Sequence, residues 1–80
     1  MTQEPKTYQP PSIEVTLPQH VIVVIVEDDR GHYLLTKSCL RLAGITNEII
    51  WLEDGQSAMD FFFNQALQDQ KKYLVLLDIR

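Results

Sequence analysis

An unbroken run of six β-branched apolar residues, Val21 to Val26, restricts the folds open to this chain more than any other feature. The run has the length of one strand and is apolar at every position, so both faces of that strand must be covered. Strands buried on both faces are typical of parallel sheets flanked by helices. The sequence therefore predicts the buried strand of an α/β fold.

A helix is predicted over residues 30–43, where apolar side chains fall on one helical face. These side chains are Leu34, Leu35, Cys39 and Leu42. We expect Cys39 to be a small buried side chain and Gly44 to end the helix. Before the helix, Asp29 is expected to cap its first turn.

Two further strands and one further helix follow. Residues 48–52 form a short apolar segment, and Asp54 and Gly55 turn the chain into a helix from about residue 56 to residue 68. The apolar side chains of this helix are Ala58, Phe62 and Ala66, flanked by Met59, Phe61 and Phe63. The last predicted strand covers residues 73–77 and ends on Asp78.

This alternation predicts an α/β fold of β-α-β-α-β order, with a parallel sheet in the order 2-1-3 and helices on both faces. Residues 1–19 contain all four prolines and are expected to form an extended or disordered leader. The third strand would have a free apolar edge, so the chain is expected to stop partway through a doubly wound fold. Such an edge favours self-association.

The composition excludes several kinds of partner. A formal net charge of −4 favours neither nucleic acid nor an anionic membrane surface. No segment has the roughly 18 apolar residues of a membrane span, and the N-terminus lacks the pattern of a signal peptide. With a single cysteine, which fits a reducing compartment, we expect a cytoplasmic protein.

Carboxylates follow two of the predicted strands. Glu27 and Asp28 close the first strand, and Asp78 closes the third, which is its neighbour in the expected sheet. Ligands of open parallel sheets bind beyond the carboxyl ends of the strands. Three like charges at one place require a cation, and Mg²⁺ prefers oxygen ligands and often acts beside phosphate. Asp78 is then a candidate nucleophile toward a phosphoryl group.

Three segments, VIVVIVEDDRGHYLL, LEDGQSAMDFF and YLVLLDIR, together resemble the response-regulator receiver domain, over residues 20–80. The resemblance implies a two-component phosphorelay in which a sensor histidine kinase or a phosphotransfer protein phosphorylates Asp78. It also implies that Glu27, Asp28, Asp78 and the main-chain carbonyl of Arg80 hold Mg²⁺. A receiver is a signalling module, not an enzyme with a separate substrate, and promotes only its own phosphorylation and dephosphorylation.

Receiver domains continue through two further strands, which carry a Ser or Thr and then a Lys that contact the phosphoryl oxygens. These parts would follow Arg80. One alternative is therefore a receiver-like interaction module, or a fragment, without phosphoryl chemistry. A phosphohydrolase of the haloacid dehalogenase type is disfavoured because Arg80 stands where its second acid belongs, and a nucleotide site is disfavoured because no Gly-rich loop follows the first strand.

Overall fold

The computed structural model describes Thr7 and residues 17–78. Its elements, in chain order, are β1 (Val21–Glu27), α1 (Arg30–Leu42), β2 (Ile49–Leu52), α2 (Gly55–Phe61), η1 (Phe62–Ala66), α3 (Leu67–Asp69) and β3 (Lys72–Asp78). The predicted helix over residues 56–68 corresponds to α2, η1 and α3, which follow one another without a break. Most of the predicted leader, and Arg80, lie outside the described residues.

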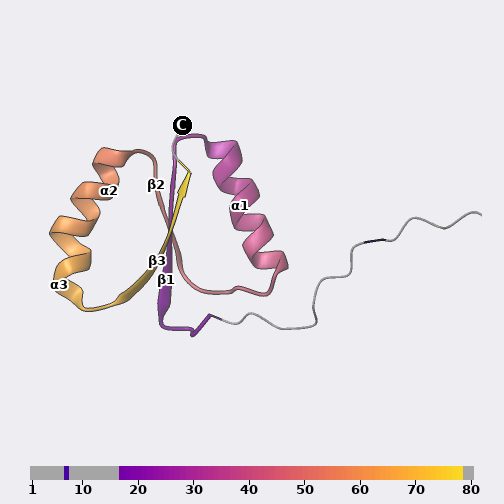
Figure 1. The fold of residues 1–80 in the computed structure, drawn as a ribbon, viewed down its shortest axis with the longest axis horizontal. Helices are drawn as coiled ribbons and strands as arrows, with labels where there is room; N and C mark the ends of the chain where they lie inside the picture. Colours follow the sequence, from indigo (N-terminus) through magenta and orange to yellow (C-terminus); the bar gives the residue numbers. More distant parts are fainter. Residues whose placement is uncertain (1–6, 8–16, 79–80) are drawn as a thin grey trace, which may run out of the picture.

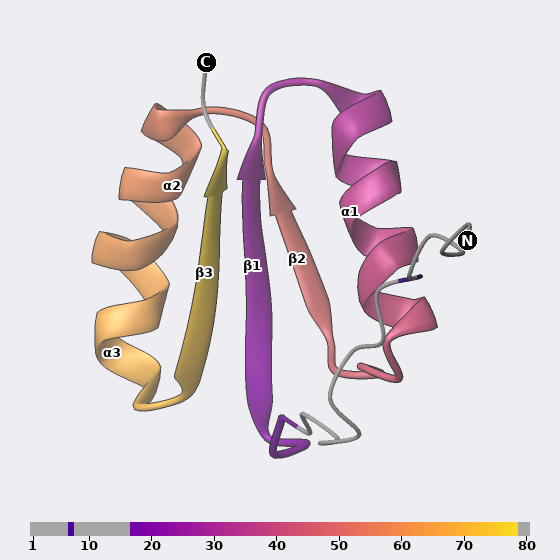
Figure 2. The same ribbon diagram turned by 45° about the vertical axis from the view of Figure 1, so that its right-hand side comes forward.

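The sheet has three parallel strands in the order β2-β1-β3. Helix α1 lies on one side of the sheet and the α2–α3 segment on the other, as Figures 1 and 2 show. The predicted α/β fold, with strand order 2-1-3, is confirmed. None of the helices in the described part of the chain is long and apolar enough to cross a membrane.

Strand β1 forms the core because neighbours cover it on both sides. Its residues from Ile22 to Glu27 are all buried. Side chains alternate between the two faces of a strand. Val24 and Val26 pack with Ala58 of α2, supported by Phe61 and other apolar side chains. Val23, Ile25 and Glu27 consequently point to the opposite face, which α1 covers.

Both predicted helix starts are confirmed by their caps. Asp29 accepts a hydrogen bond from the His32 N–H at 3.0 Å, and Asp54 accepts one from the Ser57 N–H at 2.7 Å. The hydrogen bond from Ser57 also lowers the pKa of the Asp54 carboxyl. Helix α1 ends before Gly44, whose φ of +89° is the left-handed conformation that glycine tolerates best.

The prediction that the apolar side chains of α1 face the sheet is wrong. Leu34, Leu35, Cys39 and Leu42 are all exposed. Tyr33 and Leu40 are instead half-buried, and the ring of Tyr33 stacks on Trp51 of β2 with 4.5 Å between centroids. That stack determines which side of α1 meets the sheet. Periodicity alone could not distinguish two neighbouring apolar faces of one helix.

The helices on the other side of the sheet are also only partly covered. Ala58 is buried and Phe61 and Phe62 are half-buried, whereas Met59 and Phe63 are exposed. The rings of Phe61 and Phe62 each meet Tyr73 of β3 edge-to-face. Met59 and Phe63, two of the six apolar side chains predicted for this helix, therefore do not pack against the core.

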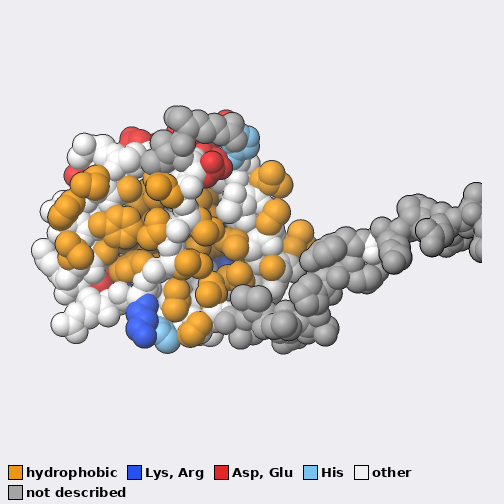
Figure 3. Space-filling view, viewed as in Figure 1, with side chains coloured by type: hydrophobic (Ala, Val, Ile, Leu, Met, Phe, Trp, Pro, Cys, Tyr) orange, Lys and Arg blue, Asp and Glu red, His pale blue; other side chains and the backbone are white. Residues whose placement is uncertain are grey.

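Strand β3 has an open edge, because β1 is its one neighbour in the described sheet. Leu74, Val75 and Leu77 are exposed along it. Figure 3, which views the molecule from the β3 edge, shows hydrophobic side chains gathered across the middle of this face. An exposed apolar strand edge is a template for pairing with another chain.

We therefore expect the 80-residue chain to self-associate through β3, and the Leu77→Lys variant to shift it toward monomer. Leu77 is 70% exposed, so a lysine there adds charge to the edge at little cost to the core. Sedimentation velocity over a concentration series measures the shift. Leu42→Lys adds the same charge to α1, and an equal effect from that control would contradict association through β3.

A side-chain hydrogen bond joins α3 to β3. The Tyr73 hydroxyl donates to Asp69, which raises the pKa of Tyr73 to about 12 and lowers the pKa of Asp69. A raised tyrosine pKa stabilises the fold below pH 10.0, the ordinary tyrosine value, and the stabilisation is lost as pH rises toward 12. A lowered aspartate pKa stabilises it above pH 3.8, and this is lost at lower pH.

The Tyr73→Phe variant should therefore lose stability relative to the parent between about pH 4 and pH 10 and converge with it outside that window. Urea midpoints at a series of pH values test this expectation. If the urea midpoints of parent and variant differ by the same amount from acid to alkaline pH, the hydrogen bond does not shift the pKa of either Tyr73 or Asp69, and the prediction is wrong.

Candidate functional site

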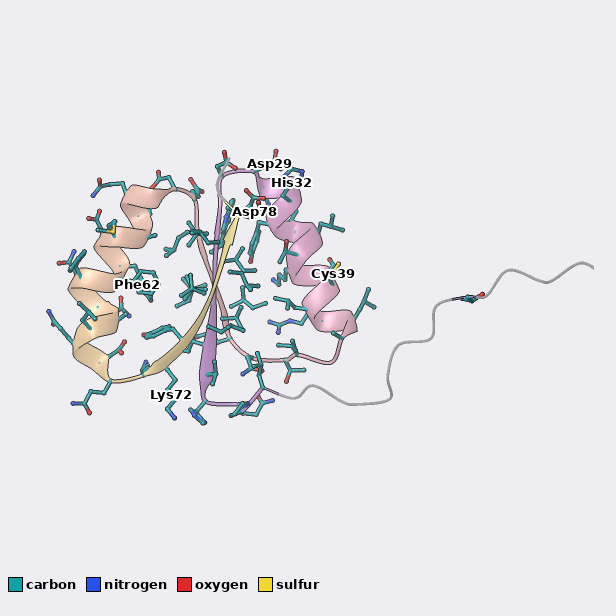
Figure 4. All side chains as sticks on the ribbon, viewed as in Figure 1. Asp29, His32, Cys39, Phe62, Lys72 and Asp78 are labelled. Atoms are coloured by element: carbon teal, nitrogen blue, oxygen red, sulfur yellow. The ribbon has the colours of Figure 1, made fainter. Side chains whose placement is uncertain are left out.

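The predicted acidic residues lie at the carboxyl ends of two adjacent strands. In the parallel register, Glu27 of β1 is paired with Asp78 of β3, and Asp28 is the next residue after β1. Neighbouring strands lie about 4.8 Å apart, so these backbone positions are close. Figure 4 shows Asp29, His32 and Asp78 at this same end of the sheet.

Glu27 is buried, which is unusual for a carboxylate side chain. It is 1% exposed and lies on the face of β1 that α1 covers. Its Oε2 accepts a hydrogen bond from the Asp29 N–H at 3.4 Å, which is long. Its Oε1 has no hydrogen-bond partner among the described residues, and lies 3.3 Å from Nδ1 of His32.

Three contacts at the loop between β1 and α1 connect Glu27, Asp29 and His32 to one another. Asp29 donates its backbone N–H to Glu27, and its side chain accepts from the backbone N–H of His32. The His32 imidazole then returns to Glu27 through the 3.3 Å contact. One cap residue thus holds the buried carboxylate and the first turn of α1 in a single arrangement.

On the β2 side, the aromatic pair of Trp51 and Tyr33 contacts the same end of β1. The indole Nε1 of Trp51 donates to the main-chain carbonyl of Glu27 at 2.8 Å. The indole ring also stacks on Tyr33, the residue after His32, at an interplanar angle of 6°. Trp51 therefore contacts the backbone at the end of β1 as well as α1.

The other two predicted carboxylates are open to solvent. Asp28 and Asp78 are both exposed, in contrast to Glu27. Within residues 17–78, no three Asp, Glu, His or Cys side chains stand close enough together to hold a metal ion. The main-chain carbonyl of Arg80 lies outside the described residues. The structure therefore brings Glu27, Asp28 and Asp78 to one edge of the sheet, but their side chains do not converge on a single metal position.

The donor set nevertheless fits Mg²⁺. This ion takes one or two carboxylates, keeps several waters and completes its shell with phosphate oxygens, so a closed cage of three carboxylates is not required. Asp28 and Asp78 are the accessible oxygen donors, whereas Glu27 is buried and its Oε1 faces Nδ1 of His32 at 3.3 Å. Two facing carboxylates at paired strand ends repel each other, and a divalent cation would offset that repulsion.

The sequence pattern does not mark His32 or Trp51 as parts of this site. No Cys or His stands at a metal-ligand spacing from His32, so a ligand motif does not identify it. A signal for His32 did exist: Asp29 caps the helix, so His32 is its third residue and lies over the strand end. Nothing in the sequence pattern predicts the hydrogen bond of Trp51.

Comparison with known proteins finds one regulatory relative. Over 60 residues, the chain is 33% identical to the probable methanogenesis regulatory protein FilR2 of Methanothrix harundinacea (strain 6Ac). These residues are 74% of this chain and 39% of the relative, so the match spans about two fifths of that protein's length. No protein-family model matches the chain. No solved structure matches it either.

Proposed function

We propose that this chain is a receiver-type phosphoacceptor of a two-component phosphorelay. In this proposal Asp78 takes a phosphoryl group from the phosphohistidine of a partner histidine kinase or phosphotransfer protein. The observation that carries the proposal is the parallel pairing of Glu27 with Asp78 at the carboxyl ends of β1 and β3. The similarity to a probable regulatory protein supports a regulatory role.

The chemistry assigns a separate task to each acid. A carboxylate oxygen of Asp78 attacks phosphorus, a P–O bond forms, and the P–N bond to the donor imidazole breaks, leaving an acyl phosphate and a free imidazole. Bound Mg²⁺ would offset the negative charge of the carboxylates and the phosphoryl oxygens. Asp28 and Asp78, which are exposed, would hold the ion directly, and buried Glu27 would act through water.

Phosphorylation by a small acyl phosphate tests this proposal without the partner kinase. The chain is incubated with Mg²⁺ and acetyl phosphate, and peptide mass spectrometry locates any adduct. We expect a hydroxylamine-labile adduct on Asp78 that disappears when a chelator removes Mg²⁺. An adduct that forms equally well with the chelator, or at other carboxylates, would contradict the proposal.

A second candidate function is an interaction module without phosphoryl chemistry. The exposed apolar edge of β3, with Leu74, Val75 and Leu77, favours it. The same phosphorylation experiment distinguishes the two candidates. A folded chain that binds no Mg²⁺ and forms no adduct, yet still pairs through β3, would be an interaction module.

A further inference from the structure

We infer that His32 is a positioning residue of the acidic site, which holds the buried Glu27 carboxylate in place at the end of β1. The inference rests on the proposed function and assigns a part of the site that the three acids alone do not provide. It starts from the 3.3 Å contact between Nδ1 of His32 and Oε1 of Glu27.

The position of Glu27 requires such a residue. A carboxylate removed from water loses its hydration and is stabilised only by polar groups around it. Glu27 is 1% exposed, and the bond that its Oε2 accepts from Asp29 is long, at 3.4 Å. The imidazole of His32 is the polar group that Oε1 faces.

The backbone fixes His32 where it can do this. Its N–H donates to the Asp29 side chain at 3.0 Å, which anchors the first turn of α1 over the end of β1. The next residue, Tyr33, stacks on Trp51, and Trp51 donates to the Glu27 carbonyl. The side chain and the main chain of Glu27 are thus held from α1 and from β2, respectively.

The buried and the exposed carboxylates consequently have different roles at this site. Because both oxygens of Glu27 face groups of the β1–α1 loop and α1, this carboxylate keeps one orientation, and it would meet a bound Mg²⁺ through water. Asp28 and Asp78 stay exposed and free to meet Mg²⁺ directly. Groups that orient a metal-site carboxylate commonly change metal affinity by 10-fold or more when they are removed.

Metal binding tests this inference directly. The probe is Mg²⁺ itself, titrated into the full chain while the fluorescence of Trp51 is recorded. Trp51 is the single tryptophan of the chain and contacts the Glu27 backbone. We expect the His32→Ala variant to bind Mg²⁺ about 10-fold more weakly than the parent. His32→Asn places an amide near the position of Nδ1 and should recover most of the affinity.

A matched control and the folding of each variant separate positioning from general stability. His20→Ala removes the other histidine, which is exposed, and should leave Mg²⁺ affinity unchanged. Urea unfolding of each variant verifies that the titrated chains are folded. If the parent binds Mg²⁺ and His32→Ala binds it equally well, the role of His32 is refuted while the proposed function stands. If the folded parent binds no Mg²⁺, the proposed function fails, and this inference fails with it.

Discussion

Replacing Asp78 by asparagine should reduce formation of the acyl phosphate from acetyl phosphate to the background of a Mg²⁺-free reaction. Asparagine keeps the size of the side chain but removes the nucleophilic oxygen charge, so no acyl phosphate can form at this position. The effect should be complete, because the other exposed carboxylates are not paired with Glu27 across the sheet. Intact mass after a fixed incubation, followed by peptide mapping, measures it.

Asp60→Asn is the matched control for this variant. Asp60 is exposed on α2, and its Oδ1 accepts a hydrogen bond from Gln56 at 3.0 Å, which asparagine can preserve. Its adduct yield should equal that of the parent. Removal of one carboxylate from the pair at Glu27 and Asp78 also relieves repulsion, so Asp78→Asn should be no less stable than the parent in urea. An adduct of undiminished yield in Asp78→Asn would refute Asp78 as the acceptor.

The largest loss of stability is expected from Ile25→Ala. Ile25 is 2% exposed and lies in register between Trp51 of β2 and Leu76 of β3. Truncating such a side chain removes buried apolar area and leaves a cavity, at a cost of about 2–5 kcal/mol. A core of this size rarely supplies more than about 3–5 kcal/mol in total, so much of the population should unfold. Urea denaturation followed by far-ultraviolet circular dichroism measures the change.

Two comparisons make this prediction specific to burial. Ile25→Val removes one methylene from the same place and should cost about 0.5–1.5 kcal/mol. Leu42→Ala removes a larger group from a side chain that is 88% exposed on α1, and should change stability by no more than about 0.5 kcal/mol. Equal losses for Ile25→Ala and Leu42→Ala would mean that β1 is not the core of the folded chain in solution.

The sequence alone was sufficient for the elements and their order. Six β-branched residues in succession, from Val21 to Val26, admit few structures other than a strand covered on both faces. The caps Asp29 and Asp54 and the left-handed Gly44 are local features, and local hydrogen bonds and backbone sterics decide them. The parallel order β2-β1-β3 then follows from the short connections and their handedness.

The sequence also predicted which acids share an edge. Glu27, Asp28 and Asp78 each end or follow a strand, and the ends of adjacent parallel strands coincide in space. It did not predict that Glu27 would be buried while Asp28 and Asp78 are exposed. That difference depends on which face of β1 receives helix α1, and on how far the first turn of the helix reaches over the strand end.

Tertiary packing decided the rest. The Tyr33 and Trp51 rings, 18 residues apart in the sequence, stack and so set the rotation of α1, which leaves Leu35 and Cys39 exposed and brings His32 to Glu27. Periodicity reports the distances along one helix, but it carries no information about a partner on another strand. The local sequence therefore determined the secondary structure and the strand order of this protein. Contacts between side chains distant in the sequence determined the arrangement within its acidic site.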